Sequence, residues 1–151
     1  MIDIVYTIGV YDLLHRGHIE HLKYCKFLGD FLVVGIMGDE IAFQQKGESP
    51  IQNEKDRAFA VESLKYVDKV YIYTDFNYLK HFKLTKANIF CITDECKDDK
   101  RFNDLRKYIK LIGGDIYYDD YRSDYSSTSL KEKIYEIYKE KNNHGNTSNS
   151  V

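Results

Sequence analysis

Cysteine is scarce in this sequence, and the few cysteines present are scattered. Cys25, Cys91 and Cys96 are the only three, and no two of them form a CxxC pair. An odd number of dispersed cysteines argues against a disulfide framework and predicts a reducing, cytoplasmic location. A zinc site is not expected, because it needs about four ligands and no further Cys or His pair completes one.

Long hydrophobic runs are also missing. No stretch approaches the roughly 20 consecutive apolar residues that cross a bilayer. Residues 1–5 lack the basic start and the long apolar core of a signal peptide. We therefore expect a soluble protein without a membrane partner.

Neither sign of charge is in excess. The chain has 22 basic and 24 acidic side chains, for a formal net charge of -2. This near balance argues against a general nucleic-acid binder, although it allows a local basic pocket for a small phosphorylated ligand. The chain is, however, rich in apolar residues. Hydrophobic residues make up 43% of its 151 residues, enough for the core of one domain.

Short apolar runs rich in β-branched residues alternate with longer amphipathic stretches. This alternation predicts a Rossmann-like, three-layer α/β sandwich with a five-stranded parallel sheet. Strands are expected at residues 4–8, 31–37, 70–73, 89–93 and 115–118. Helices are expected from near 17 to near 29, and at 53–66, 76–82, 101–112 and 128–139. The domain is expected to span 1–140, and residues 141–151, rich in Asn, Ser and Gly, are typical of a disordered tail.

Polar clusters follow several of the expected strands. They occupy residues 12–18, 38–46, 94–95 and 122–129. Ligands of open α/β sheets bind beyond the carboxyl ends of the strands. The four clusters therefore predict one site at that edge of the sheet.

The first cluster joins a strand to a helix through a glycine turn. Gly9 has no Cβ and allows the backbone to approach a ligand closely. The helix that begins near Gly17 offers free backbone N–H groups and a partial positive charge, which favour phosphate. His15 and His18 flank this glycine and can donate hydrogen bonds to the same ligand. His21, farther along the helix, is interpreted as a satisfied or exposed side chain.

This segment, Thr7 to His18, resembles the signature of the cytidylyltransferase family, a His-x-Gly-His element preceded by Asp-Leu-Leu. The resemblance covers roughly residues 4–139. Further pieces follow in order: 34–40, Lys46-Gly47, 50–54 with Arg57, 66–70, and 122–129, which is similar to the family's Arg-Thr-Glu-Gly-Ile-Ser-Thr-Thr element.

The resemblance implies transfer of CMP from CTP to a small phosphorylated alcohol. The short chain is most similar to glycerol-3-phosphate cytidylyltransferases, which make CDP-glycerol and release pyrophosphate. Mg²⁺ bound through the CTP phosphates and a homodimer are also implied. The resemblance assigns catalysis to His15, His18, Lys46 and Arg122. It assigns nucleotide binding to Thr7, Ile8, Gly9, Tyr11, Gly17, Asp94, Ser127 and Thr128. It assigns acceptor binding to Asp12, Arg57 and Lys65.

Some of these residues have plainer interpretations. Arg57 can pair with Glu54 or Asp56 on its own helix, and the Ser127-Thr128 hydroxyls can simply cap a helix. Tyrosines are abundant, at 14, and more often pack helices or line a dimer contact than stack on a base.

The chain also departs from the family pattern. Ile8 and Tyr125 stand where many relatives have glycine, Cys96 where the short glycerol-phosphate enzymes tend to have tryptophan, and Lys65 where arginine is common. The alternatives are therefore a phosphoethanolamine, phosphocholine or other polyol-phosphate cytidylyltransferase, or an adenylyltransferase of the same superfamily. A non-catalytic nucleotide-binding module, in which Tyr125 blocks turnover, is an alternative from a different class.

Overall fold

The fold is that of a computed structural model, which describes residues 1–145. Its centre is a five-stranded, all-parallel sheet in the order β3-β2-β1-β4-β5. The strands are β1 (Ile4–Gly9), β2 (Phe31–Met37), β3 (Lys69–Tyr73), β4 (Ile89–Thr93) and β5 (Asp115–Asp119). The chain winds outward from β1 in one direction and then returns to continue in the other. The strand order therefore reverses between β1 and β4, where such sheets bind ligands.

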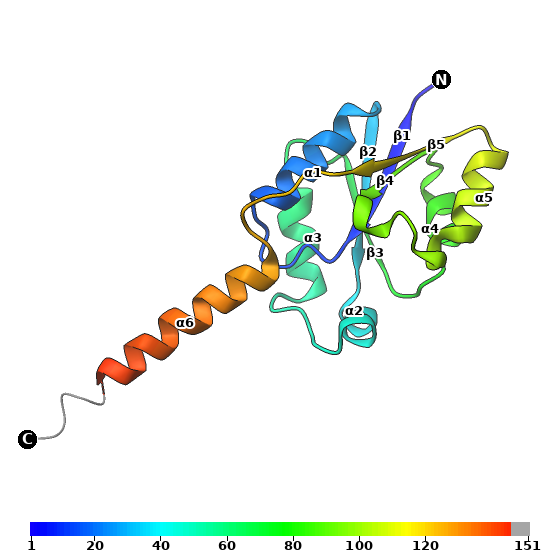
Figure 1. The fold of residues 1–151 in the computed structure, drawn as a ribbon. Coiled ribbons are helices and arrows are strands. Elements are labelled where there is room, and N and C mark those ends of the chain that lie inside the picture. Colours follow the sequence, from blue (N-terminus) through cyan, green and yellow to red (C-terminus); the bar gives the residue numbers. More distant parts are fainter. Residues whose placement is uncertain (146–151) are drawn as a thin grey trace, which may run out of the picture.

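Helices cover both faces of the sheet (Figure 1). α1 (Arg16–Phe27) and α3 (Glu54–Glu62) pack on one face, and α4 (Tyr78–Thr85) and α5 (Asn103–Leu111) on the other. Two hydrophobic clusters result, one for each face. Short 3₁₀ turns, η1 (Asp94–Cys96) and η2 (Lys100–Phe102), connect β4 to α5. The predicted fold class, a Rossmann-like three-layer sandwich, is confirmed.

The central strands are apolar along most of their length. In β2 every residue after Phe31 is buried. A strand covered on both faces has no solvent side, so its sequence shows a continuous apolar run rather than an alternating one. This property made the strands visible in the sequence.

The helices differ from the prediction in two places. α2 (Asp39–Lys46) was not expected: this stretch was interpreted as a polar loop, but it is a helix between Gly38 and Gly47. Gly47 takes the left-handed conformation that commonly ends a helix, with φ of 77°. α3 ends at Glu62, not at residue 66 as predicted.

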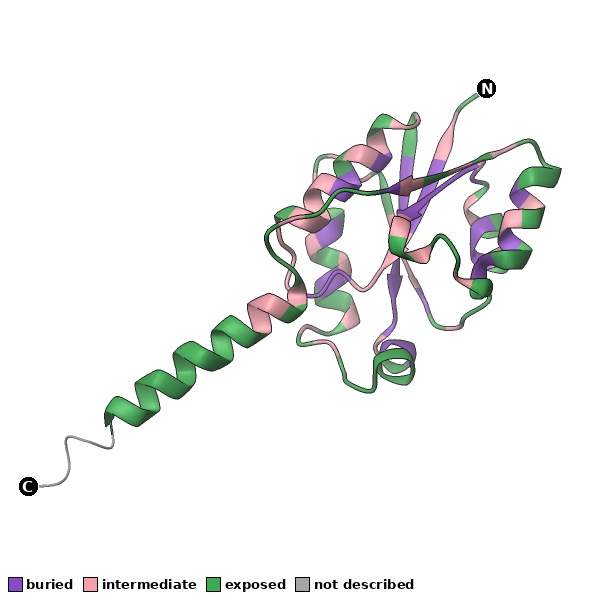
Figure 2. Ribbon diagram, in the orientation of Figure 1, coloured by how far each residue is buried: buried purple, intermediate pink, exposed green. Residues whose placement is uncertain are grey.

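The last helix, α6 (Ser127–Gly145), projects away from the sheet (Figure 1). None of its residues is fully buried, and most are exposed (Figure 2). It includes residues 141–145, which were assigned to the tail, while the rest of the predicted tail lies outside the described residues. Within the described chain, no helix has both the length and the hydrophobicity needed to cross a bilayer.

Candidate active site

A cleft of about 620 Å³ lies at the carboxyl edge of the sheet. Its lining comes from the segments that follow β1, β4 and β5, from the end of α2 and from the start of α6. Residues of all four predicted polar clusters line it, so the prediction that they converge at this edge is confirmed. The predicted site residues in the lining are Ile8, Gly9, Tyr11, Asp12, His15, Gly17, His18, Lys46, Arg122, Ser127 and Thr128.

Two stacked histidines line the cleft. The rings of His15 and His18 have centroids 3.9 Å apart. His15 is the N-cap of α1, and its Nδ1 accepts the Gly17 amide at 3.0 Å. The Nδ1 of His18 accepts the amide of His15 at 3.3 Å. Because each Nδ1 is an acceptor, each neutral ring carries its proton on Nε2 and has that N–H left to donate.

The same surroundings hold His18 in its neutral form. Burial, together with the neighbouring His15 and His21 rings, lowers the pKa of His18 to about 3. Burial also lowers the pKa of His15. At neutral pH both rings are therefore uncharged donors.

The lowered pKa of His18 predicts that the protein loses stability in mild acid. An unfolded histidine titrates near 6.5, so between pH 6.5 and about 3 the unfolded chain binds more protons and stability falls as pH falls. Between pH 7 and pH 5 the contribution of His18 should be about 1–2 kcal/mol, since the ring is only partly buried. Urea unfolding at both pH values should show a smaller loss for His18→Asn than for the unchanged protein. Equal losses of stability in the two proteins would contradict the lowered pKa of His18.

The loop before α1 has an unusual backbone. Tyr11 and Leu13 have φ of 54° and 51°, in the left-handed region that non-glycine residues rarely adopt. A Cβ on Gly9 would lie 2.8 Å from the Tyr11 ring, so glycine at this position makes room for that ring. The ring of Tyr11 in turn meets the edge of His18, with centroids 5.3 Å apart. The strained loop thus sets the position of the catalytic histidine candidate.

Asp12 ties this loop to the segment after α2. Its carboxylate accepts the amides of Ile51 and Gln52 at 2.8 and 3.0 Å, and Lys131 Nζ lies 3.5 Å away. Burial acts to raise the pKa of Asp12, but these hydrogen bonds and the lysine outweigh it and lower the pKa. The carboxylate lines the cleft with both oxygens engaged, which makes it a positioning group.

Arg57 does not line the cleft, contrary to the role in acceptor binding that the sequence suggested. Its side chain is fully buried and donates to three acceptors. These are the Val10 carbonyl at 2.7 Å, the Gln52 carbonyl at 2.9 Å and Asp39 Oδ1 at 2.7 Å. Arg57 therefore joins three loops beneath the site and has no geometry for reaching a substrate phosphate.

Lys65 is also remote from the cleft. It follows α3, which begins near the cleft and runs back towards the opposite edge of the sheet. Nearby Asp68 hydrogen-bonds both backbone groups of Leu32, at the start of β2. Lys65 is not among the residues that line the cleft, so the structure gives no support to the predicted acceptor contact.

Two predicted nucleotide-binding residues lie beside the cleft rather than in its lining. Thr7 is buried, and its hydroxyl lies 3.0 Å from His21 Nε2. The other ring nitrogen of His21 lies 2.7 Å from Asp119 Oδ2. Both nitrogens of His21 are thus engaged, although the Cys25 and Cys91 sulfurs lie within 4.8 Å of its ring nitrogen. Asp94 pairs with Arg122 at the mouth of the cleft.

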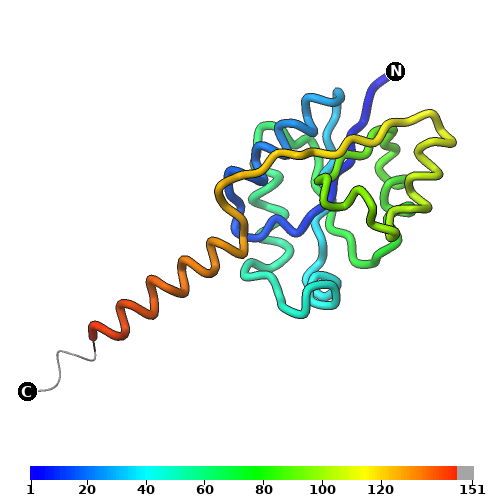
Figure 3. The backbone as a smooth tube through the Cα atoms, in the orientation of Figure 1, coloured from blue at the N-terminus to red at the C-terminus, as the bar shows by residue number. Residues whose placement is uncertain are grey.

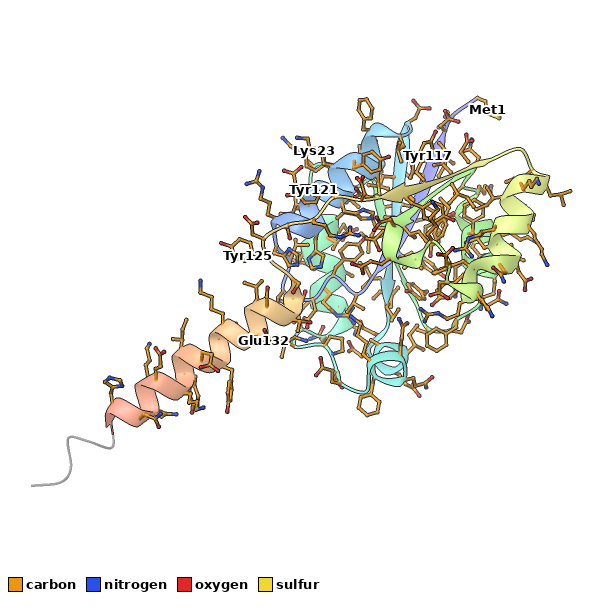
Figure 4. The ribbon with its side chains drawn as sticks, in the orientation of Figure 1. Met1, Lys23, Tyr117, Tyr121, Tyr125 and Glu132 are labelled. Carbon is orange, nitrogen blue, oxygen red and sulfur yellow. The ribbon has the colours of Figure 1, made fainter. Side chains whose placement is uncertain are left out.

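The segment between β5 and α6 closes one side of the cleft. Figure 3 shows it passing the loop that precedes α1. Tyr121 and Tyr125 lie along it (Figure 4), and both line the cleft. A Cβ on Gly17 would lie 2.5 Å from Ser123 Oγ. Glycine at this position therefore allows the closing segment to contact the start of α1.

α6 begins at the cleft with a reciprocal serine cap. Ser126 Oγ accepts the Ser129 amide at 3.0 Å, and Ser129 Oγ accepts the Ser126 amide at 2.8 Å. Ser127, in contrast, donates its hydroxyl to the Asp12 carbonyl at 2.5 Å. The cleft thus has two helix starts beside it, those of α1 and α6, and both favour an anionic ligand.

Sequence reasoning missed part of the lining. Tyr73 of β3, Tyr78 of α4 and Arg101 of η2 also line the cleft. Tyr73 is the last residue of a predicted strand, so the rule that ligands bind at strand ends was the available signal. Arg101 was assigned to a helix, and nothing in its local sequence separates it from a surface arginine.

The sequence model of the Cytidylyltransferase-like family matches residues 6–133. The chain belongs to this family. It is therefore an enzyme domain of the nucleotidyltransferase type, and the cleft described above is its candidate active site.

Two relatives resemble this cytidylyltransferase-like chain, one over most of its length and the other over half of it. The Bifunctional protein HldE of Helicobacter pylori strain J99 is 35% identical over 133 residues, 87% of this chain and 27% of the relative. The Ethanolamine-phosphate cytidylyltransferase of Dictyostelium discoideum is 44% identical over 78 residues, 51% of this chain and 22% of the relative. The chain thus matches about a quarter of the length of these curated relatives.

A solved structure has the same fold. The lipopolysaccharide core biosynthesis protein from Thermoplasma volcanium GSS1 aligns with a TM-score of 0.69 and 30% sequence identity. The alignment covers 81% of this chain and all of that one.

Proposed function

We propose that this domain transfers CMP from CTP to a small phosphorylated alcohol, with glycerol 3-phosphate as the first candidate. The observation that carries the proposal is the pair of stacked histidines at the start of α1. Their Nδ1 atoms are occupied by backbone amides, so two neutral Nε2–H donors remain for phosphate oxygens.

In the proposed reaction, an oxygen of the acceptor phosphate attacks the α-phosphorus of CTP. The bond between the α-phosphorus and the bridging oxygen breaks, and pyrophosphate leaves with the electron pair. Catalysis of this reaction depends on positioning the two substrates and neutralising the charge on the phosphates, and it requires no covalent enzyme intermediate. His15 and His18 would donate to the phosphate oxygens, and Lys46 and Arg122, which line the cleft, would add positive charge.

Arg122 is held by carboxylates before any nucleotide binds. It pairs with Asp94, and its Nε lies 3.9 Å from Glu95. About half of its side chain is exposed, so it has freedom to exchange these partners for a triphosphate. This exchange is part of the proposal.

Mg²⁺ fits the donor set of the cleft. This ion keeps several waters and is commonly bound through one or two carboxylates and the substrate phosphates. Glu48 and Glu95 supply exposed carboxylates in the lining. When bound, Mg²⁺ would reduce the negative charge of the triphosphate.

The acceptor has a second candidate class, phosphoethanolamine or phosphocholine, because one relative is named for ethanolamine phosphate. Tyr125 bears on the non-catalytic alternative: it lines the cleft but is half exposed. Because its ring is not fixed within the core, we favour a catalytic domain.

The proposal is tested by pyrophosphate release in the presence of Mg²⁺. CTP, ATP, UTP and GTP are each combined with glycerol 3-phosphate, phosphoethanolamine, phosphocholine and other polyol phosphates. Release that requires CTP and glycerol 3-phosphate supports the proposal. Release with ATP would identify ATP instead of CTP as the nucleotide substrate. Release only with an amine-containing acceptor would identify that acceptor instead of glycerol 3-phosphate. CTP binding without release with any acceptor supports the non-catalytic alternative.

We also propose a homodimer in a cytoplasmic setting, and α6 supports the dimer. Ile134, Ile137 and Tyr138 share one side of this helix and are 59%, 46% and 66% exposed. An isolated projecting helix is marginal in water, whereas pairing with the same helix of a second copy covers its apolar side. Light scattering should give the mass of a dimer. Ile134→Glu with Ile137→Glu should give a monomer and Glu136→Gln should not, while a monomeric unchanged protein contradicts the proposal.

A further inference from the structure

The cleft has two flanks on either side of the histidines. One flank lies over β4, β5 and the start of α6 and contains Arg122. The other is lined by Met37 and Tyr73 at the ends of β2 and β3, by Tyr78 at the start of α4, and by Arg101 and Phe102 of η2. The resemblance assigned no residue to this second flank, and the proposed mechanism uses none of its residues.

A buried hydroxyl without a partner lies in this second flank. Tyr73 is 1% exposed, and its Oη has no hydrogen-bond partner among the described residues. Burying a hydroxyl unpaired costs about 1–3 kcal/mol. Because Tyr73 also lines the cleft, a ligand hydroxyl or phosphate oxygen can supply the missing partner.

The surroundings of Tyr73 indicate the kind of ligand. The rings of Tyr73 and Tyr78 have centroids 6.2 Å apart, and Tyr78 lies 4.6 Å from Phe102. Arg101 lines the cleft together with these rings. Burial and the neighbouring Tyr78 raise the pKa of Tyr73, and the positive charge of Arg101 acts against that rise. Arg101 pairs with Asp99 through Nη2 at 2.6 Å. Nearly half of the Arg101 side chain remains exposed.

We propose that Tyr73, Tyr78 and Arg101 form the acceptor subsite and select a hydroxyl-bearing phosphorylated acceptor, a polyol or sugar phosphate. This inference rests on the proposed function and specifies its substrate class. The flank contains two phenols and one cation. Phenols and a guanidinium suit hydroxyl and phosphate oxygens, whereas a trimethylammonium group has no hydrogen-bonding atom and would leave the Tyr73 hydroxyl unpartnered. The subsite therefore favours glycerol 3-phosphate over phosphocholine.

Tyr73→Phe tests the proposal because it removes only the unpartnered hydroxyl. Without ligand, this change should leave the protein at least as stable as before, since no hydrogen bond is lost. The KM for glycerol 3-phosphate should rise roughly tenfold or more, with the KM for CTP unchanged, because a site that pairs a substrate hydroxyl loses that contact. Discrimination against the analogue 3-hydroxypropyl phosphate, which lacks one hydroxyl, should fall by a similar factor.

Tyr6 supplies the matched control. Its hydroxyl is also buried and unpartnered, but it lies against the backbone of Gly35 and outside the cleft lining. Tyr6→Phe should change stability in the same direction and leave both KM values unchanged. Arg101→Gln should raise the KM for the acceptor as Tyr73→Phe does. An unchanged acceptor KM in Tyr73→Phe, or an equal rise in Tyr6→Phe, overturns the subsite.

Equilibrium binding separates this inference from the proposed function. Calorimetry of glycerol 3-phosphate is carried out with the α,β-methylene analogue of CTP, which cannot react. A Kd that rises roughly tenfold in Tyr73→Phe supports the subsite even if pyrophosphate release fails. Equal Kd values in both proteins, or no binding to either, contradict the subsite, whatever the result of the release assay.

Discussion

His18→Ala is expected to lower kcat for pyrophosphate release by roughly 100-fold or more, the usual cost of losing one donor to a developing oxyanion. The ring Nδ1 of His18 accepts the His15 amide, which leaves its Nε2–H to donate to a phosphate oxygen in the proposed mechanism. The change therefore removes a donor that acts while charge develops on the phosphates. The KM for CTP should change less than kcat, because the effect falls mainly on the transition state.

The control for this prediction is His144→Ala. His144 is an exposed histidine on α6, far from the start of that helix and from the cleft lining. It should leave kcat unchanged. His15→Ala combined with His18→Ala should cost less than the product of the single losses, because the two rings act as a unit. A near-normal kcat in His18→Ala would remove His18 from the mechanism.

Arg57→Met is expected to destabilise the fold by about 3–5 kcal/mol, the usual effect of breaking a buried ionic and hydrogen-bonded group. Methionine keeps most of the bulk but leaves the carbonyls of Val10 and Gln52, and the Asp39 carboxylate, without their donor. For a domain of this size the loss corresponds to a fall in Tm of roughly 10–15 °C. Thermal and urea unfolding measure it.

Lys55→Met, an exposed change on the same helix, is the matched control and should have little effect on Tm. The two interpretations of Arg57 differ in what they predict. If Arg57 bound the acceptor phosphate, its variant would keep its Tm and raise the acceptor KM. That result would contradict the structural role.

The sheet could be predicted from the sequence because each buried strand is a compact apolar run. The strand at residues 31–37 was placed at its observed limits. α2 was missed because it is a short, polar stretch between two glycines. Its contacts, such as that of Asp39 with Arg57, are made with residues elsewhere in the chain and are not visible in its own sequence. The end of α3 was misplaced because apolar residues continue beyond Glu62, but the chain there turns towards β3.

The position of the site could be predicted from the sequence, but the role of each residue within it could not. His15, Gly17 and His18 are local in sequence and lie where a strand meets a helix, so their meeting required no long-range information. The roles of Arg57 and Asp12, in contrast, depend on partners in distant loops. Asp12, for example, contacts Ile51 and Gln52, which lie more than 30 residues away in the sequence. Burial of a charged side chain through such contacts has no signature in a single sequence.

The central claim is that the α-phosphorus of CTP is attacked and pyrophosphate leaves. CTP labelled with ³²P at the α-position is incubated with the protein, Mg²⁺ and glycerol 3-phosphate, and the products are separated. We predict that the label appears in CDP-glycerol and that the pyrophosphate is unlabelled. Label found in CMP without transfer, or in CDP with release of inorganic phosphate, would contradict the account.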